Sequence, residues 1–355
     1  MESENATQKS SGLKDWPDED LERVISCPVC GAGERFLLYS GLEDRVFCSA
    51  PGRWDMYQCS ECRCAYLDPR PSLASIHLAY RNYYTHNKQC SSSVDLLSLL
   101  KSLARVLANG YLNYQYGYKF FPTSRFGERI VPLLPSFQRA LHRQMRYLPQ
   151  ARLGARLLDV GFGSGEFMRL ARRIGWHVSG VDFDPVVVAN ASECGLNVYH
   201  GDLCSFDEVQ DSFDAITINH VLEHVSDPGE MISSAYRLLK PGGMLFIETP
   251  NIDAYGHMRF RENWRGLEVP RHLVLFNWES VIGLLNKVGF VELQKIVRFA
   301  PYSGMARASR SIHGRINSLA DFVLKYLDVI TGICLENFSI LDDSKTEFIT
   351  ICARK

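Results

Sequence analysis

The feature that most constrains this chain is a glycine-rich turn between a short apolar run and an apolar-faced helix. Residues 158–165 read LDVGFGSG, and Phe167, Ala171 and Ile174 then recur at helical spacing. Glycine allows a turn with positive φ and a close approach of the backbone to a ligand, and the start of a helix presents unpaired N–H groups. This order of strand, turn and helix predicts a parallel α/β fold that binds a ligand at the turn.

The residues around the turn separate three classes of ligand. The Lys-Ser or Lys-Thr pair of a phosphate-binding loop is absent. A dinucleotide-binding turn needs Gly or Ala three residues after its second glycine, and this position is Glu166, whose carboxylate would face a pyrophosphate. S-adenosylmethionine (SAM) carries no phosphate, but a sulfonium cation and an amino-acid group. The turn therefore favours SAM over NAD, although such a turn alone is also compatible with no ligand at all.

Two acidic residues follow on successive predicted strands. Asp182 ends the strand predicted over residues 178–182, 17 residues after Gly165, where a carboxylate can accept hydrogen bonds from both ribose hydroxyls. Asp202 follows the next strand, where a carboxylate can accept a hydrogen bond from an adenine amino group. Each acid alone is also typical of a turn or a helix cap, but the glycine turn and both acids in this order predict a cofactor that contains adenosine.

Strand and helix patterns alternate through the second half of the chain, which predicts a doubly wound α/β sheet with helices on both faces. Strands are predicted over residues 155–160, 178–182, 196–200, 213–219 and 244–249, with later strands over 290–297 and 347–353. Helices are predicted over residues 166–174, 185–194 and 228–240, and residues 302–340 are expected to be partly helical.

Over about residues 155–297 the sequence resembles the class I SAM-dependent methyltransferases. The resemblance is carried by the motifs LLDVGFGSG, VDFDP, GDL, FDAITINHVLEHV, LLKPGGMLFIETPN and ENWRGLEVPRHLVLF. These are most similar to the branch that contains the ubiquinone-biosynthesis O-methyltransferases and the methyltransferases of bacterial sugar and polysaccharide pathways. The resemblance implies a Rossmann-like, seven-stranded sheet whose last strand is antiparallel.

The resemblance also implies a cofactor site. The turn glycines would line the methionine part of SAM, Asp182 would hold the ribose, and Asp202 would flank the adenine with its neighbour. Asn219 and His220 would lie beside the methyl group. The expected SAM-binding residues are Asp159, Gly161, Gly163, Gly165, Asp182, Phe183, Asp202, Leu203, Asn219 and His220.

Methyl transfer to a hydroxyl requires an aligned acceptor and a base that removes its proton, and neutral His suits this task near pH 7. The candidate bases are His220, His224 and His272, and His272 is favoured because relatives carry a similar Pro-Arg-His loop. A structural histidine bonded to backbone is the alternative in each case. Relatives often have Glu-x-x-Glu-His here, proposed to hold a divalent metal. In this chain His220 replaces the first Glu, which disfavours Mg²⁺ because this ion prefers oxygen ligands. The alternative to a metal site is that Glu223 and His224 cap the following segment or form hydrogen bonds with neighbouring residues.

The acceptor is less constrained by the sequence. Residues 259–271 hold four arginines, and arginine suits phosphate and carboxylate groups. We therefore expect a small-molecule or glycan acceptor, including anionic ones such as a nucleotide sugar or a lipid-linked intermediate, although a solvated charged loop would look the same. The formal net charge of −1, and the lack of an Asn/Asp-Pro-Pro-aromatic motif at Asn219, argue against nucleic acid. The alternatives are a zinc-ribbon RNA methyltransferase or RNA-associated factor, and an inactive SAM-fold scaffold.

Four of the 11 cysteines form two CxxC pairs near the start of the chain. Cys27 and Cys30 make the first pair and Cys59 and Cys62 the second, with 28 residues between the pairs. Two such pairs place four thiolates around a tetrahedral Zn²⁺, and four protein ligands leave no open position for catalysis. We therefore expect a structural zinc ion in a zinc-ribbon-like module; Cys48 and Cys64 are alternative ligands, and free thiols are the alternative to metal.

The chain is expected to contain a disordered tail over residues 1–22, the zinc-ribbon-like module over 23–70, a helical linker or lid over 71–150 and the methyltransferase domain over 151–355. The leucines from Leu96 to Leu107 share one helix face, and aromatic residues crowd residues 111–121; we expect core and lid packing, with contact to a lipid or membrane surface as the alternative. The sequence has neither a signal peptide nor a transmembrane stretch, so a cytoplasmic location is expected, and it does not indicate an oligomeric state.

Overall fold

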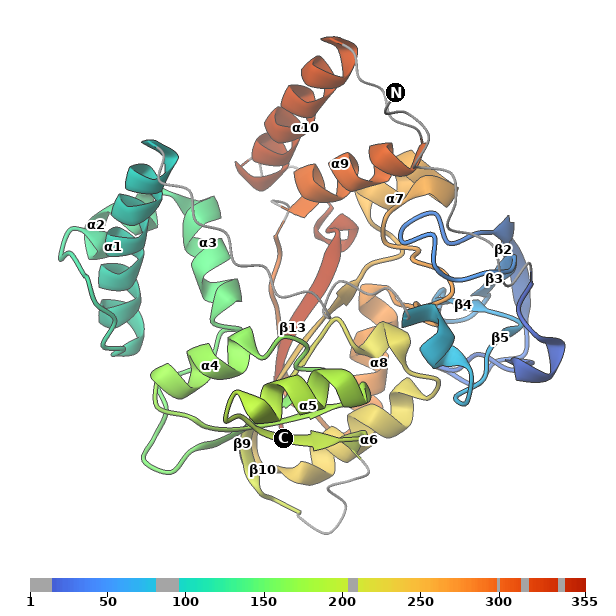
Figure 1. Ribbon diagram of the computed structural model, residues 1–355, viewed down its shortest axis with the longest axis horizontal. Helices are drawn as coiled ribbons and strands as arrows, with labels where there is room; N and C mark the ends of the chain where they lie inside the picture. The colour runs from blue at the N-terminus through green and yellow to red at the C-terminus, as the bar shows by residue number, and fades with distance from the viewer. Residues whose placement is uncertain (1–14, 81–95, 204–209, 299–300, 314–318, 338–341) are drawn as a thin grey trace, which may run out of the picture.

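The computed structural model describes residues 15–80, 96–203, 210–298, 301–313, 319–337 and 342–355. A large twisted sheet forms the centre, a group of helices lies on one side of it, and a small β-rich module built from the first described residues lies on the other (Figure 1). Among the described residues, no helix combines the length and the apolarity needed to cross a membrane.

The central sheet has seven strands in the order β12-β13-β10-β9-β6-β7-β8. Strands β6 to β10 run parallel where they pair, whereas β13 runs antiparallel to both β10 and β12. This confirms the expected Rossmann-like sheet with an antiparallel last strand. The strands are β6 (Arg156–Val160), β7 (His177–Asp182), β8 (Asn197–His200), β9 (Phe213–Asn219), β10 (Leu239–Pro250), β12 (Val291–Lys295) and β13 (Phe348–Arg354).

Alternate residues of the central strands enter two different cores, because side chains on a strand point to opposite faces in turn. Leu158, Ile216 and Ile247 belong to one buried cluster, while Leu157 and Phe246 belong to the other. The first cluster includes α6 (Pro228–Leu238), α8 (Trp278–Val288) and the N-terminal module. The second includes α4 (Glu166–Arg173), α5 (Pro185–Glu193) and the N-terminal helices. Helices therefore cover both faces, as the strand–helix alternation predicted.

The helices of the sheet begin where the sequence provides caps. Asp184 accepts hydrogen bonds from two backbone N–H groups at the start of α5, and Asn277 forms a capping box with Ser280 at the start of α8. The helix expected over residues 228–240 ends at Leu238 instead, because Leu239 already pairs with Phe213 at the start of β10. The Pro-Gly-Gly segment that we expected to end the helix forms an irregularity within this strand.

The N-terminal module is a four-stranded sheet in the order β11-β4-β3-β2. Its own strands are β2 (Arg35–Leu42), β3 (Trp54–Cys59) and β4 (Ala65–Leu67), and the fourth, β11 (Val274–Leu275), comes from the region expected to belong to the methyltransferase domain. One sheet thus joins two regions that lie far apart in the sequence.

The expectation of a disordered tail over residues 1–22 is corrected at its end. Residues 1–14 lie outside the described residues, but Trp16 is buried and its ring packs edge-on against Trp54, with 5.3 Å between the ring centroids. Strand β1 (Leu21–Glu22) pairs with β5 (Arg70–Pro71). A large apolar ring that can be buried next to the module is the physical reason why the chain is ordered here.

The helical region contains α1 (Leu96–Tyr116), α2 (Gly127–Ile130) and α3 (Pro135–Gln144). A Cβ at Gly127 would lie 2.0 Å from the carbonyl oxygen of Leu107, so only glycine permits this contact between α1 and α2. Tyr111 and Tyr118 are buried in the core, whereas Leu103 of the expected leucine stripe is exposed. The side chains of Leu96 and Leu100 lie outside the described part of the structure. The remaining helices α7 (Tyr255–Phe260), α9 (Pro301–His313) and α10 (Leu319–Asn337) pack together beside the C-terminal part of the sheet.

Candidate functional site

The glycine turn connects the carboxyl end of β6 to the start of α4. Gly161, Gly163 and Gly165 have φ values of 63°, 54° and 69°. A Cβ at Gly161 would lie 2.3 Å from Val221 Cγ2, and a Cβ at Gly165 would lie 2.5 Å from Leu196 Cδ1. A Cβ at Gly163 would meet nothing within 4 Å. The middle glycine therefore borders open space, in which a ligand can approach the backbone.

Asp182 lies beside this turn, at the carboxyl end of β7. Its Oδ2 accepts a hydrogen bond of 3.1 Å from the N–H of Gly163, and its Oδ1 accepts one of 3.1 Å from the N–H of Asp184. Burial raises the pKa of the Asp182 carboxyl, and these two bonds oppose the rise. Each carboxylate oxygen can accept a second bond, so the group can still accept ribose hydroxyls. Phe183, which follows, is 49% exposed.

The remaining predicted adenosine contacts lie at the end of β8. The N–H of Gly201 donates to the carbonyl of Asp182 at 3.0 Å, which places the start of the next loop beside β7. In that loop the side chain of Asp202 is exposed and that of Leu203 is buried. The predicted ribose and adenine contacts are thus brought to one edge of the sheet.

Asp159, by contrast, lies beneath the turn rather than at its surface. It is fully buried, accepts a hydrogen bond of 2.8 Å from Thr217 Oγ1, and forms an ion pair with Arg146. The Arg146 guanidinium also lies 3.7 Å from the ring centroid of Phe167, in the first turn of α4. A cation therefore lies next to the glycine turn, and the sequence analysis did not single it out. The available signal was the run of arginines at positions 139, 143 and 146, just before the turn.

A second group of charges surrounds Glu248 near the end of β10. Arg143 Nε donates to Glu248 Oε1 at 2.8 Å, and Arg298 and Thr350 donate to Oε2 at 2.6 and 2.9 Å. Glu248 is fully buried. Burial alone would raise its pKa, but the hydrogen bond with His220 and the two arginines hold the pKa well below its usual value. A buried network of hydrogen bonds and ion pairs around Glu248 therefore connects α3, β10 and β13 beside the predicted site.

His220 lies between two of the site's carboxylates. Its Nδ1 is 3.3 Å from Glu223 Oε1, its Nε2 is 3.4 Å from Glu248 Oε1, and its φ of 55° is unusual for a residue with a side chain. Burial alone would lower its pKa, but Glu223 and Glu248 outweigh this effect and raise the pKa to about 9. The imidazole therefore carries a proton at neutral pH, a state in which it stabilises negative charge but does not act as a base.

The other two candidate bases lie close to each other. The ring centroids of His224 and His272 are 4.7 Å apart. His224 Nδ1 is 3.0 Å from the carbonyl oxygen of Arg271, and His272 Nδ1 is 2.8 Å from that of Gly266. A carbonyl only accepts, so each Nδ1 is the donor. Burial holds the pKa of His272 well below its usual value, so this ring is neutral near pH 7.

Glu223 completes a group that could hold a cation. One ligand atom from each of Glu223, His224 and His272 lies within 4.8 Å of the others. Glu223 is buried; burial alone would raise its pKa, but the hydrogen bond with His220 and the nearby histidines lower the pKa to about 2. Two imidazole Nε2 atoms whose Nδ1 atoms bond to carbonyls, together with one carboxylate, match the donors of a transition-metal site better than those of Mg²⁺.

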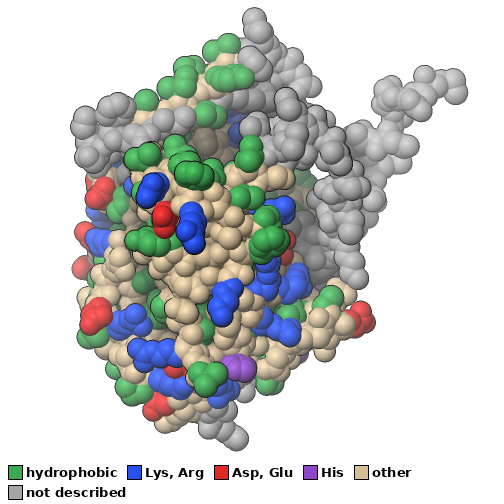
Figure 2. Space-filling view, turned by 90° about the vertical axis from the view of Figure 1, so that its left-hand side faces the viewer, with side chains coloured by type: hydrophobic (Ala, Val, Ile, Leu, Met, Phe, Trp, Pro, Cys, Tyr) green, Lys and Arg blue, Asp and Glu red, His purple; other side chains and the backbone are tan. Residues whose placement is uncertain are grey.

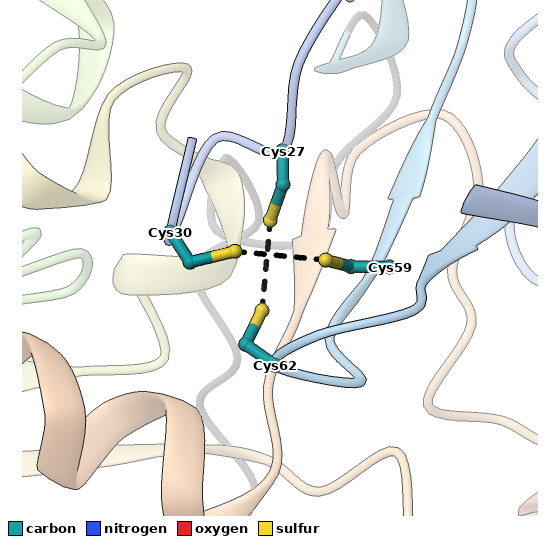
Figure 3. A group of neighbouring side chains, drawn as sticks. All are labelled: Cys27, Cys30, Cys59 and Cys62. Atoms are coloured by element: carbon teal, nitrogen blue, oxygen red, sulfur yellow. Dashed lines mark hydrogen bonds between the residues drawn. The ribbon is translucent and has the colours of Figure 1, made fainter. Parts of the chain in front are cut away.

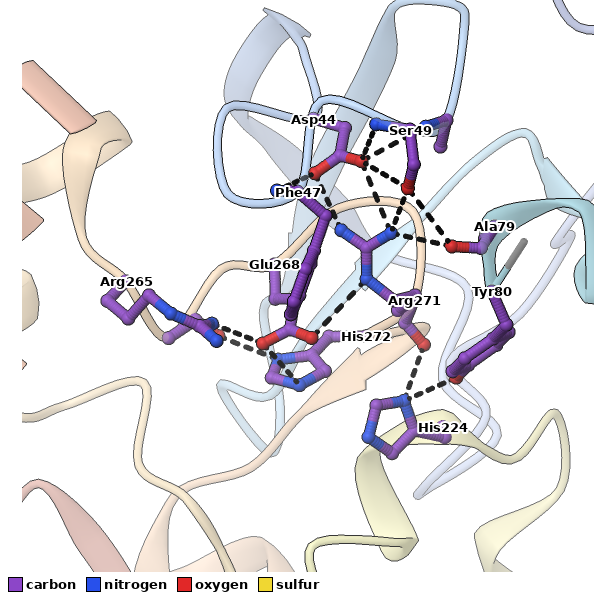
Figure 4. Close-up of polar contacts among 12 residues, drawn as sticks. Asp44, Phe47, Ser49, Ala79, Tyr80, His224, Arg265, Glu268, Arg271 and His272 are labelled. Carbon is purple, nitrogen blue, oxygen red and sulfur yellow. Dashed lines mark hydrogen bonds and ion pairs between the residues drawn. The ribbon is translucent and has the colours of Figure 1, made fainter. Parts of the chain in front are cut away.

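The expectation that arginines in the loop after β10 bind an anionic acceptor is wrong for Arg271. This side chain is 0% exposed, and its guanidinium forms bonds of 2.6 and 3.2 Å with the two carboxylate oxygens of Asp44 (Figure 4). Arg265 is paired with Glu268, and Arg259 is 3.2 Å from Asp328. A buried charge needs a partner, and all three of these arginines have protein carboxylates as partners.

The four predicted zinc ligands lie together (Figure 3). Cys27 Sγ is 3.6 Å from Cys62 Sγ, and Cys30 Sγ is 3.6 Å from Cys59 Sγ. Ligands at the usual Zn–S distance in a tetrahedron are about 3.8 Å apart, so these residues fit Zn²⁺. Cys64 Sγ is also 3.4 Å from Cys27 Sγ and is fully buried, which keeps it as an alternative ligand.

Comparison with known proteins identifies relatives of this chain. Residues 135–295 match a family described as "Methyltransferase domain". The chain is 41% identical over 105 residues to a ubiquinone biosynthesis O-methyltransferase of Xanthomonas oryzae pv. oryzae, covering 28% of this chain and 44% of that protein. It is 34% identical over 156 residues to one of Actinobacillus pleuropneumoniae, covering 41% and 60%. The chain thus spans about half the length of the curated relatives it matches.

Among solved structures, the chain is similar to a phosphoethanolamine N-methyltransferase 2 of Haemonchus contortus. The TM-score is 0.48 at 19% sequence identity, with 82% of this chain and 62% of that chain covered. The family match and the curated relatives confirm the resemblance to class I SAM-dependent methyltransferases that was drawn from the sequence.

Proposed function

We propose that this chain, whose residues 135–295 form a methyltransferase domain of the class I SAM-dependent type, transfers a methyl group from SAM to a small-molecule acceptor. The observation that carries the proposal is the pairing of the glycine turn with Asp182. The carboxylate holds the N–H of Gly163, whose Cα faces open space, and it retains lone pairs for two hydroxyl groups. This arrangement suits a ribose next to a backbone that a ligand can approach closely.

The same geometry supports a role for Arg146 that the sequence analysis missed. SAM carries a carboxylate on its amino-acid part, and that part is expected along the glycine turn. The Arg146 guanidinium lies beside the first turn of α4 and pairs with the buried Asp159. We infer that Arg146, which has further N–H donors, also receives this carboxylate.

In this proposal His272 is the favoured general base. Its Nδ1 is hydrogen-bonded to the carbonyl of Gly266, so Nε2 is the nitrogen that would take the acceptor's proton, and burial keeps the ring neutral before that step. The Nε2 atom lies 3.8 Å from Glu268 Oε2, a carboxylate that would stabilise the protonated ring. His224 is the second candidate, because its Nδ1 is likewise hydrogen-bonded to a carbonyl, that of Arg271. His220 carries a proton, and we assign it to charge stabilisation beside the methyl donor.

A divalent cation at Glu223, His224 and His272 is the alternative role for the same residues. Bound there, a cation would act as a Lewis acid that lowers the pKa of an acceptor hydroxyl. The two imidazoles would then be ligands, and neither would be a base. Activity that is lost on chelation and restored by Mn²⁺, which a four-thiolate site does not favour, would select this role. Activity that Mn²⁺ does not restore and that His272→Gln abolishes would select the base.

The charge distribution supports an anionic acceptor. Residues 96–177 contain thirteen lysines and arginines but only three acidic residues, although the whole chain has a formal net charge of −1. Figure 2 views the molecule from the side of α1 to α4 and shows Lys and Arg side chains spread over this face. A positive face raises the local concentration of anions. A nucleotide sugar or a lipid-linked phosphate fits this field, and an oxygen acceptor is supported by the relatives, which are named O-methyltransferases.

The test combines binding and turnover. Calorimetry should show that the purified protein binds SAM, and SAM consumption should then be measured against quinone precursors, nucleotide sugars, glycans and RNA. Absence of SAM binding would refute the proposal and favour a scaffold role. Turnover with RNA alone, falling steeply with salt, would select an RNA methyltransferase instead. A cytoplasmic location remains a prediction from the sequence.

A further inference from the structure

His224 and His272 depend on one loop for their orientation. Residues 266–273 follow α7, and two carbonyl groups of this loop accept the Nδ1 protons of the rings: Gly266 for His272 and Arg271 for His224. The N–H of Leu273 also donates to the carbonyl of Glu223 at 2.8 Å. The position of this loop therefore decides where both Nε2 atoms point.

The N-terminal module holds this loop in place through one buried cation. The guanidinium of Arg271 pairs with both carboxylate oxygens of Asp44, donates to the carbonyl of Ala79 at 2.8 Å and lies 4.3 Å from the ring centroid of Phe47 (Figure 4). Asp44 is itself fixed by three backbone N–H groups of its own loop. Despite burial, the guanidinium of Arg271 holds the pKa of Asp44 below its usual value, so the pair is ionised near pH 7.

Further hydrogen bonds connect the loop to the region of the predicted zinc site. Strand β11 pairs with β4 directly after the loop, and the N–H of Leu67 donates to the carbonyl of Leu273 at 3.1 Å. Asn277, which caps α8, donates through its side chain to the carbonyl of Cys62 at 2.9 Å. A shift of the cysteine cluster would therefore move both ends of β11.

The segment that follows the module, which packs into the same core, also places a side chain within the predicted site. Tyr80 ends a short 3₁₀ helix (Ile76–Tyr80), and its hydroxyl lies 2.9 Å from His224 Nδ1. Its ring packs edge-on against Phe183, with 5.2 Å between centroids, and is 9% exposed. Tyr80 thus lies between the candidate base and the residue expected to contact adenosine.

We propose that the N-terminal cysteine module and the segment that follows it contribute to the methyl-transfer site. Asp44 of the module and Tyr80 of that segment are positioning residues that set the orientation of His272 and His224. The proposal rests on the proposed function, and it assigns the module a role beyond that of a structural or RNA-binding appendage. Zinc at Cys27, Cys30, Cys59 and Cys62 would support this geometry, because the second cysteine pair flanks β4 and is bonded to the start of α8.

The experiment compares three variants of the full-length protein: Asp44→Asn, Tyr80→Phe and the control Glu43→Gln. Glu43 is adjacent to Asp44 but, within the described residues, its carboxylate pairs with the exposed Arg53, and the two side chains are 48% and 77% exposed. Long-range ¹H–¹⁵N spectra of histidine report which ring nitrogen carries the proton, and calorimetry reports SAM affinity. Turnover is measured with the best acceptor from the panel.

Asp44→Asn should change the signals of both His224 and His272 and lower kcat at least tenfold, with the Kd for SAM within threefold of the wild type. Tyr80→Phe should change only the His224 signal, and Glu43→Gln should change neither. Removal of zinc by a chelator, followed by the same spectra, should reproduce the Asp44→Asn pattern. If Asp44→Asn does not fold, the proposal is tested by the histidine spectra of Tyr80→Phe and of the metal-free protein.

Unchanged histidine signals in folded Asp44→Asn, or in Tyr80→Phe together with metal-free protein, would overturn the proposal. So would a kcat loss that Glu43→Gln shares. The readouts also separate this proposal from the proposed function: absent SAM binding in the wild type would refute the methyltransferase assignment, whereas the histidine spectra test the module's role without any turnover.

Discussion

Alanine substitution of the turn glycines separates cofactor binding from folding. Gly161 and Gly163 both have a φ near 60°, a region that costs a residue with a Cβ about 1–2 kcal/mol. At Gly161 the new methyl group would also meet Val221 at 2.3 Å, and overpacking of this kind adds about 1–3 kcal/mol. A Cβ added at Gly163 would have no described neighbour within 4 Å, so only the backbone cost applies. Gly161→Ala should therefore lower the free energy of unfolding by about 2–5 kcal/mol and Gly163→Ala by about 1–2 kcal/mol.

For SAM affinity we expect the larger effect from Gly163→Ala, the variant that is expected to lose less stability than Gly161→Ala. The methyl group added by Gly163→Ala would enter the space where the cofactor is expected to contact the backbone. We expect at least tenfold weaker SAM binding, which corresponds to about 1.4 kcal/mol. Gly154→Ala is the matched control, because Gly154 also has a positive φ, of 77°, with nothing within 4 Å of a new Cβ, but it precedes β6 and lies outside the predicted site.

Urea unfolding measures the stability of the three variants, and calorimetry measures their SAM affinity. Gly154→Ala should lose about as much stability as Gly163→Ala while it binds SAM like the wild type. The reasoning is refuted if Gly163→Ala and Gly154→Ala bind SAM with the same affinity, because the open space beside Gly163 would then not be the cofactor site.

Three further predictions concern single side chains. Asp182→Asn should weaken SAM binding in calorimetry by about 1.5–3 kcal/mol, the range for hydrogen bonds to a charged group, and an unchanged Kd would remove Asp182 from the site. Asn277→Ala should lower the free energy of unfolding in urea by about 1–2 kcal/mol, because it removes the capping box of α8 and the bond to the Cys62 carbonyl; a loss below about 0.5 kcal/mol would contradict this. Burial raises the pKa of Glu347 from 4.5 to about 7, so its protonated form stabilises the fold below pH 4.5 and this contribution, up to about 3 kcal/mol, is lost as the pH rises to 7. Glu347→Gln should flatten this loss in denaturation curves measured between pH 5 and 8, and parallel curves for the two proteins would contradict it.

The sheet could be predicted almost completely from the sequence, because its signals are local. The inner strands are short apolar runs, and side chains cap the starts of α5, α6 and α8. The turn after β6 and the acid that ends β7 lie next to the strands that position them, so Gly163 and Asp182 could be predicted as SAM contacts without knowledge of the strand order. The four candidate zinc ligands could be predicted for the same reason, since each CxxC pair forms one tight turn. The site's charge network was missed, because Arg143 and Glu248 are 105 residues apart and only the fold brings them together.

Arg271 shows most clearly why composition misleads in such a loop. An arginine that binds a substrate and an arginine that binds a protein carboxylate have the same local sequence, and the difference lies in a partner 227 residues away. Removal of one member of a buried pair leaves the other charge unpaired, which costs about 3–5 kcal/mol. Loss of activity in an Arg271 variant would therefore not demonstrate substrate binding. A double variant in which both Asp44 and Arg271 are replaced by apolar residues would distinguish the two roles, because it removes the unpaired charge and leaves the loop free to move. Recovered stability without recovered turnover would show that this ion pair serves the orientation of the histidines rather than the stability of the fold.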